Sequence, residues 1–161
     1  MTIEIHAMGD YWEPGLDERT ELGELVHRAK DLGDPVAGRE LTERFAHFVD
    51  TVAPVDATIA PIPASPDRPT GLLEMVAGDR MQRLVERRNV TARLRDVDPA
   101  DRAAVAQAGG YVITAECAGM NVVVLDDVVL TGTTLRHVGE LLDAAGTASV
   151  VGVALARTRR R

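Results

Sequence analysis

The segment VVVLDDVVLTGTTL, residues 122–135, decides the fold of this chain. It opens with four aliphatic residues, passes through two adjacent carboxylates, Asp126 and Asp127, and ends in the stretch Thr131-Gly132-Thr133-Thr134. An uninterrupted aliphatic run is typical of a parallel strand that is buried on both faces of a sheet. We therefore predict a central strand over residues 121–128, then a loop, then a helix over residues 133–145.

Strands and helices alternate along the rest of the chain. Further strands are predicted at residues 2–7, 56–62, 90–97, 111–114 and 149–157, and further helices at residues 17–32, 35–52, 70–87 and 98–108. The helix at 35–52 carries the clearest start signal, with Asp34 as N-cap and Pro35 at the first helical position. This alternation predicts an α/β fold with a mostly parallel central sheet flanked by helices.

Composition sets the broad class. The 161 residues suffice for one domain with a real core, and 45% hydrophobic and 27% charged residues are typical of a globular protein. The chain has neither a bilayer-spanning apolar run nor a signal-peptide pattern, so we expect a cytoplasmic location. The net charge of −7 argues against a dedicated nucleic-acid binder. The lone Cys117 excludes an internal disulfide and a cysteine zinc site.

The two carboxylates indicate a ligand site. Ligands of open parallel sheets bind at the carboxyl ends of the strands, which is where we expect Asp126 and Asp127. Adjacent carboxylates repel each other, so they need hydroxyl donors, a metal ion or cationic neighbours. A ribose supplies two hydroxyl donors through its vicinal diol.

The threonine- and glycine-rich stretch indicates a phosphate site. Backbone N–H groups at a helix start bind anions, and a glycine lets a phosphate approach closely. Either feature alone is usually a turn or an N-cap, but the combination fits a ribose 5-phosphate. The chain lacks both GxxxxGK[ST] and GxGxxG, so the other common phosphate motifs are unsupported.

These residues resemble the signature of type I phosphoribosyltransferases, enzymes that bind 5-phosphoribosyl-1-pyrophosphate (PRPP). That signature is four apolar residues, two acids, two apolar residues and T-T-G-x-T. Residues 122–129 and 131–134 match it, whereas Leu130 stands where threonine, alanine or aspartate is commoner. The resemblance implies one domain over residues 1–161, with a small N-terminal hood at about 1–52 and a PRPP-binding core at about 53–161.

Weaker similarities point to the ComF-like branch of that family. They are LVHRAK at 25–30, Pro61-Ile62-Pro63, ERRNV at 86–90 and ALART at 154–158. The N-terminal cysteine zinc ribbon of many ComF-like proteins is absent from the sequence, as is their glycine-phenylalanine-asparagine-glutamine run after the proline loop.

The resemblance also implies roles for single residues. Asp126 and Asp127 would be the catalytic carboxylates and would hold the ribose hydroxyls, directly or through Mg²⁺, the implied cofactor. The rest of the PRPP site would be Val128, Val129, Leu130, Thr131, Gly132, Thr133 and Thr134. The pyrophosphate loop would contain Pro63, Ala64, Ser65 and Arg68, with further contacts from Arg87 and Arg88.

The implied reaction, which belongs to nucleotide metabolism, transfers phosphoribosyl from PRPP to a nitrogen acceptor and releases pyrophosphate. Leu130 can neither hydrogen-bond nor take a proton, which disfavours a hypoxanthine-type acceptor and leaves the acceptor open. The alternative is a non-catalytic PRPP sensor, or a DNA-uptake accessory like ComF whose tail at 157–161 touches nucleic acid. A third reading is an α/β domain with a decayed motif. The sequence leaves catalytic activity and a homodimer open.

Overall fold

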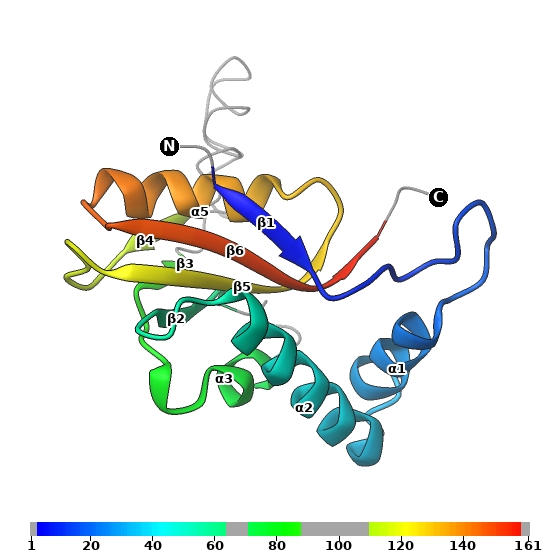
Figure 1. The fold of residues 1–161 in the computed structure, drawn as a ribbon. Helices are drawn as coiled ribbons and strands as arrows, with labels where there is room; N and C mark the ends of the chain where they lie inside the picture. Colours follow the sequence, from blue (N-terminus) through cyan, green and yellow to red (C-terminus); the bar gives the residue numbers. More distant parts are fainter. Residues whose placement is uncertain (1–2, 64–70, 88–109, 159–161) are drawn as a thin grey trace, which may run out of the picture.

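A four-stranded parallel sheet forms the centre of the molecule (Figure 1). The computed structural model describes residues 3–63, 71–87 and 110–158. The strand order is β1-β6-β5-β2, and every neighbouring pair is parallel. The strands are β1 (Glu4–Ala7), β2 (Thr58–Pro61), β5 (Asn121–Val129) and β6 (Ser149–Arg157). The predicted α/β class with a mostly parallel sheet is therefore confirmed.

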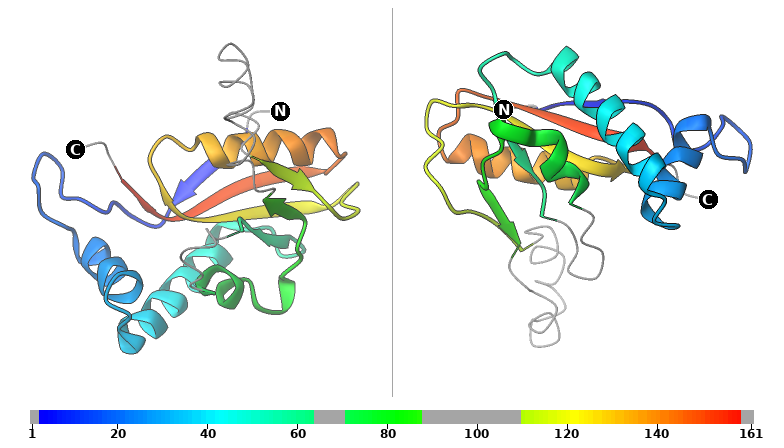
Figure 2. Two further views of the ribbon diagram at one scale, coloured as in Figure 1. Left: turned by 180° about the vertical axis from the view of Figure 1, so that it is seen from behind. Right: turned by 90° about the horizontal axis from the view of Figure 1, so that it is seen from below.

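Helices cover both faces of this sheet (Figures 1 and 2). On one face lie α1 (Glu21–Lys30), α2 (Pro35–Val52), α3 (Leu72–Ala77) and the 3-10 turn η1 (Gly78–Arg80). The other face carries α5 (Thr133–Ala144). A separate antiparallel pair consists of β3 (Val85–Arg87) and β4 (Tyr111–Ile113). No helix within the described ranges is both long and apolar enough to cross a membrane.

The aliphatic run of β5 joins the two halves of the core. Val123 and Leu125 pack into a cluster with buried residues of α1, α2 and α3. Val122 and Val124 face the opposite way, into a cluster with buried residues of α5. Successive side chains of a strand point to opposite faces, so a continuous aliphatic run is what a sheet covered on both sides requires.

Local signals predicted several element boundaries. Helix α2 runs from Pro35 to Val52 as expected, because the Asp34 carboxylate accepts hydrogen bonds from the N–H groups of Val36 (2.9 Å) and Ala37 (3.2 Å). Strand β6 also has its predicted bounds. Helix α1 is shorter than predicted, since Thr20 caps it by accepting from the Gly23 N–H (2.9 Å).

The predicted helix over residues 70–87 is confirmed only for its first part, which contains α3 and the 3-10 turn η1, and it is wrong for residues 81–87. Helix α3 ends at Ala77, because Gly78 adopts a φ of +52° and a ψ of −137°, which breaks the helical path. The chain then becomes extended, and Val85–Arg87 pairs with Tyr111–Ile113 in the two-stranded sheet. The apolar spacing at residues 84 and 85 therefore reflects a strand. The predicted strand at 90–97 and helix at 98–108 lie outside the described residues.

Candidate active site

The two carboxylates lie at the carboxyl edge of the sheet. Strand β2 pairs with β5 up to Leu125, and the Ile62 N–H makes a last bond to the Leu125 carbonyl (2.8 Å). Beyond that point β5 continues beside β6 alone, as far as Val129. The strand is therefore one residue longer than predicted, and Asp126 and Asp127 belong to it. They lie beyond the last residue of β5 that pairs with β2.

Both aspartates bind the backbone that follows them. The Asp127 N–H donates to Asp126 Oδ1 (2.9 Å), and the Val128 N–H donates to Asp127 Oδ1 (2.6 Å). The alternation of side chains between the two faces of the sheet is also interrupted here. By regular alternation Val128 would lie on the same face as Val124, but it belongs to the cluster on the opposite face, which contains Val123. The regular strand is thus disturbed at the pair, and each carboxylate has one oxygen fixed against the main chain.

The two carboxylates differ in their electrostatic surroundings. Burial raises the pKa of Asp126 from 3.8 to about 6, the charge of Asp127 adds to the rise, and the cation of Lys30 opposes it. Asp127 is 40% exposed and forms an ion pair with Lys30, which extends from the end of α1. Asp126 is thus desolvated, while Asp127 is neutralised by its ion pair with Lys30.

Tyr111 is a residue that the sequence did not single out. Burial raises the pKa of its hydroxyl, the charges of Asp126 and Asp127 raise it further, and Arg87 lowers it. The Arg87 guanidinium lies 5.9 Å from the centre of the Tyr111 ring. Tyr111 on β4 therefore lies within the electrostatic influence of the two aspartates on one hand and of Arg87 on β3 on the other. Arg88 lies outside the described residues.

The segment after β5 forms a strand-to-helix turn. Gly132 adopts a φ of +72° and caps α5 without a side-chain hydrogen bond. The Arg136 N–H makes a helical bond to the Gly132 carbonyl (2.9 Å), so the N–H groups of residues 133–135 have no partner within the helix. The hydroxyls of Thr131 and Thr133 lie 2.7 Å apart. Amides and hydroxyls thus converge as an anion site requires.

Arg136 adds a cation to this turn. Its Nη1 donates to the Thr131 carbonyl (2.5 Å), and its guanidinium lies close to Gly132. Arg136 was not among the predicted site residues, although a basic residue one turn after the glycine of such a motif was the available signal. Leu130 is 42% exposed at the start of the same turn, and Val129 is buried.

The predicted pyrophosphate loop begins beside the carboxylates. Pro63 follows Ile62, whose N–H is bound to the residue just before Asp126. Ala64, Ser65 and Arg68 lie outside the described residues. Among the residues that are described, no group of three or more His, Cys, Asp and Glu side chains has the arrangement of a metal site. Two adjacent carboxylates still suit Mg²⁺, which commonly binds one or two carboxylates together with substrate phosphates.

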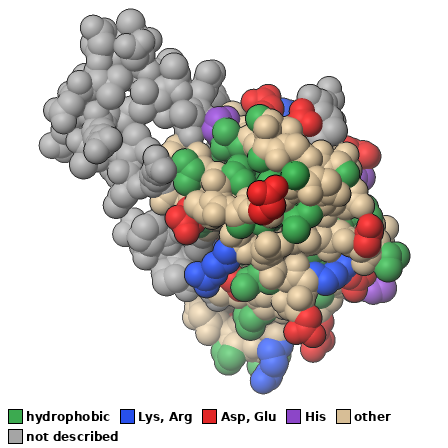
Figure 3. All heavy atoms as spheres, turned by 90° about the vertical axis from the view of Figure 1, so that its left-hand side faces the viewer, with side chains coloured by type: hydrophobic (Ala, Val, Ile, Leu, Met, Phe, Trp, Pro, Cys, Tyr) green, Lys and Arg blue, Asp and Glu red, His purple; other side chains and the backbone are tan. Residues whose placement is uncertain are grey.

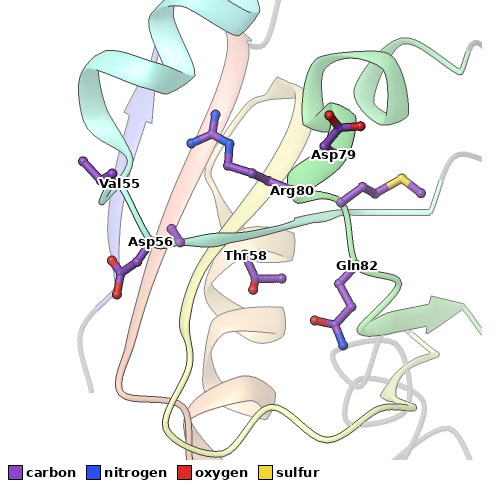
Figure 4. Close-up of a pocket in the computed structure, with 8 residues that line it drawn as sticks. Val55, Asp56, Thr58, Asp79, Arg80 and Gln82 are labelled. Atoms are coloured by element: carbon purple, nitrogen blue, oxygen red, sulfur yellow. The ribbon is translucent and has the colours of Figure 1, made fainter.

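A hollow of about 340 Å³ lies at the opposite edge of the sheet (Figure 4). Its lining consists of Val55, Asp56, Ala57, Thr58, Asp79, Arg80, Met81 and Gln82. This is where β2 begins, and none of the predicted site residues takes part. Seen from the side on which the strands begin, acidic and basic side chains lie scattered among hydrophobic ones (Figure 3).

Of the comparisons with known proteins, the match to a family model is the one that agrees with the sequence signature. No match was found among curated proteins. A solved structure that matches is a hypoxanthine phosphoribosyltransferase from Staphylococcus aureus, with 14% identity, a TM-score of 0.41, and coverage of 87% of this chain and 68% of that chain. The model of the phosphoribosyl transferase domain family matches residues 76–161, which is more than half of the chain and includes the carboxylates and the strand-to-helix turn. The chain belongs to the phosphoribosyl transferase domain family.

Proposed function

We propose that this chain binds PRPP and transfers its phosphoribosyl group to a nitrogen acceptor. One observation carries the proposal. Two carboxylates on β5 are followed along the chain by a turn and by the N-terminus of helix α5, which is a candidate anion site. A ribose 5-phosphate presents a diol and a phosphate, which are the partners that these two sites would recognise. The family of the chain supports the same activity in general terms.

The phosphate half of the ligand would bind at the start of α5. The N–H groups of residues 133–135 and the helix dipole would hold the 5-phosphate. The hydroxyls of Thr131, Thr133 and Thr134 add donors, and Arg136 adds a charge-assisted bond. A Cβ at Gly132 would lie 2.7 Å from Ile5 Cδ1, so a glycine with positive φ is what lets the turn pack against β1 at this point.

The diol half would bind at Asp126 and Asp127, directly or through Mg²⁺. When bound, Mg²⁺ would neutralise charge on the pyrophosphate. The residues assigned to the pyrophosphate are those of the loop, Pro63, Ala64, Ser65 and Arg68, together with Arg87 and Arg88. Arg87 is supported by its position beside Tyr111, whose hydroxyl lies within the electrostatic influence of both carboxylates.

In the reaction, a nitrogen lone pair forms a bond to the anomeric carbon of the ribose. The bond from that carbon to the pyrophosphate oxygen breaks, and the oxygen keeps its electron pair. Positive charge develops on the ribose in between, so two fixed carboxylates beside it lower the barrier. Leu130 offers the acceptor no polar group, which leaves the acceptor unassigned.

A second candidate is a PRPP-binding protein without transferase activity. The 42% exposed leucine at position 130 favours it, because the turn carries an apolar side chain where a polar contact with an acceptor would be useful. A ComF-like DNA-uptake accessory protein belongs to this class. Arg157 lies in β6, so a basic tail would be confined to the residues after it. We retain a single domain over residues 1–161, with boundaries near residue 52, and a cytoplasmic location as predictions.

Calorimetric titration with PRPP and Mg²⁺ tests the proposal. We expect binding of PRPP, weaker binding of ribose 5-phosphate, and none of ribose, because the phosphate site contributes to both phosphorylated ligands. Absence of PRPP binding up to millimolar concentration would reject the function. Pyrophosphate release with a panel of nucleobases and amines then separates the transferase from the non-catalytic candidate.

A further inference from the structure

One lysine from the N-terminal helices reaches the carboxylate pair. Lys30, the last residue of α1, contacts Asp127 Oδ2 through its ammonium group, across 97 residues of sequence. It is the sole lysine in the sequence. The Lys30 side chain is 20% exposed, so this ion pair is less accessible to water and salt than a pair on the open surface.

Two other basic residues near the end of α1 have partners that do not belong to the sheet. Arg28 pairs with Asp34, the N-cap of α2. His27 Nδ1 lies 2.7 Å from Asp31 Oδ2, one helical turn later. Lys30 is thus the basic residue of this last turn that bridges to β5, and its partner is a predicted ligand-binding carboxylate.

The contact makes the two carboxylates unequal as ligand sites. Asp127 has Oδ1 bound to the Val128 N–H and Oδ2 bound to Lys30, so both oxygens are engaged within the chain. Asp126 has Oδ1 bound to the Asp127 N–H, and none of its described contacts is an ion pair. A cation or hydroxyl that binds Asp127 Oδ2 must displace Lys30, whereas one that binds Asp126 displaces no cation.

Contacts farther back hold the body of α1 in place. A Cβ at Gly23 would lie 2.0 Å from the Tyr11 carbonyl oxygen, so helix and loop meet at that glycine. The Thr20 N–H also donates to the Tyr11 carbonyl (3.1 Å), and Arg44 of α2 pairs with Glu21 (2.9 Å). Displacing Lys30 would therefore remove the ion pair that links the last turn of α1 to β5, while the first turns of α1 stay attached.

We propose that Lys30 is an internal cation that competes with the ligand for Asp127. Binding of Mg²⁺ or of a ribose hydroxyl to Asp127 would displace the Lys30 ammonium group from this carboxylate. The last turn of α1 would then lose its ion pair to β5, and the N-terminal helices would thereby be coupled to the site. This inference rests on the proposed function, because it takes the ligand of Asp127 to be a ribose diol or its Mg²⁺ ion.

A titration with Mn²⁺ alone, without any ribose phosphate, tests the competition directly. Lys30→Met should bind Mn²⁺ about 5- to 10-fold more tightly than the wild type, since no internal cation has to leave. Arg28→Met is the matched control, because it removes one positive charge from the same helical turn but from a different partner. Its Mn²⁺ affinity should stay within about 2-fold of the wild type. When Asp127 is already replaced by asparagine, the additional change Lys30→Met should not increase the affinity for Mn²⁺ further.

Hydrogen exchange tests the coupling to α1. The N–H groups of Asp31 and Leu32 both bond to the His27 carbonyl, at 2.8 and 3.2 Å, and so report on the last turn. Mg²⁺ with ribose 5-phosphate should speed their exchange in the wild type. In Lys30→Met they should exchange fast from the start and change little on adding the ligand.

The outcomes separate this inference from the proposed function. Equal or weaker Mn²⁺ binding by Lys30→Met overturns the competition, as does a gain of the same size in Arg28→Met. Absence of PRPP binding in every form rejects the proposed function, while the Mn²⁺ titration still decides the role of Lys30. Circular dichroism checks the fold of Lys30→Met, and Lys30→Gln replaces it if the methionine variant does not fold.

Discussion

The two edges of the parallel sheet are both lined with charges but use them differently. At the edge where the strands begin, Asp56 accepts a hydrogen bond from the Asn121 amide (3.0 Å), and Ser149 in turn bonds to Asn121 (2.7 Å). Arg80 pairs with Asp50 at the same edge. Each of these polar groups has a neutralising or hydrogen-bonding partner nearby, in keeping with a structural role.

At the carboxyl edge Asp127 is paired with Lys30, but the charge of Asp126 is not balanced by an ion pair among the described residues. Asp126 is desolvated beside a second carboxylate, and the first amides of α5 point out of the helix without a side-chain cap. Such an arrangement costs stability unless a ligand offsets it. Polarity alone therefore does not mark a site, whereas polar groups that lack a neutralising partner within the described chain indicate one.

The largest expected effect is on the affinity for PRPP, which should depend on aspartates at the carboxyl edge and not on an aspartate at the other edge. Asp126→Asn and Asp127→Asn should each weaken binding of PRPP with Mg²⁺ by about 100-fold, or ~3 kcal/mol, because each removes a charged acceptor of the diol or its metal. Asp56→Asn, which makes the same change at the other edge, should leave the dissociation constant unaltered. Calorimetry measures all three variants. Normal binding by both carboxyl-edge variants would disprove the diol assignment.

The next prediction concerns the pH dependence of stability. The folded-state pKa of Asp126, about 6, lies above its ordinary value of 3.8, so the folded protein holds this proton more tightly than the unfolded chain. The tighter proton binding by Asp126 in the folded state contributes fully to the free energy of unfolding below pH 3.8, and this contribution is lost as the pH rises through 6. Asp126→Asn, which stays neutral, should therefore be more stable than the wild type at pH 8, by about 2 to 3 kcal/mol.

That gap should narrow as the pH falls through 6 towards 4, because the folded wild-type carboxyl then becomes protonated and no longer carries a buried charge. Urea unfolding in EDTA at several pH values measures it. Asp56→Asn is again the comparison at the opposite edge, and its difference from the wild type should not follow the same pH course. Parallel pH profiles for the wild type and Asp126→Asn would contradict a desolvated carboxylate at this position.

A smaller effect should come from the glycine that fixes the N-terminal helices near the carboxyl edge. Gly23→Ala places a methyl group against the Tyr11 carbonyl and should destabilise the protein by about 1 to 3 kcal/mol. Gly38→Ala in α2 is the matched control, since its methyl group would meet no atom within 4 Å. It should stabilise the protein by about 0.5 to 1 kcal/mol. Urea unfolding that shows both changes to be stabilising would refute the close contact.

The smallest effect belongs to the edge where the strands begin. Arg80→Met breaks an ion pair with Asp50 whose partners are 35% and 61% exposed, and it should cost less than ~1 kcal/mol. PRPP binding should be unchanged, because the residue lies at the far edge of the sheet. A loss of binding would show that the hollow beside Arg80 communicates with the site, and it would weaken the contrast between the edges.

Much of this architecture was predictable because its causes are local. The aliphatic run that becomes β5, the caps of α2 and the start of α5 depend on neighbouring residues, and each was found where expected. The error at residues 81–87 has one local cause, the backbone of Gly78 that ends α3, and one non-local cause, a pairing partner. Apolar spacing there fits both a helix and a strand, and the pairing of β3 with Tyr111–Ile113 settles the matter from a distance.

What the sequence determined by itself is the order of parts in the site: a buried strand, two carboxylates, a glycine turn and a helix N-terminus. These follow from periodicity, charge and backbone preference within about a dozen residues. Only the tertiary structure decided that the two carboxylates are unequal. Burial of Asp126 and the pairing of Asp127 with Lys30 depend on segments far apart in the chain, because desolvation and ion pairing are properties of the packed molecule.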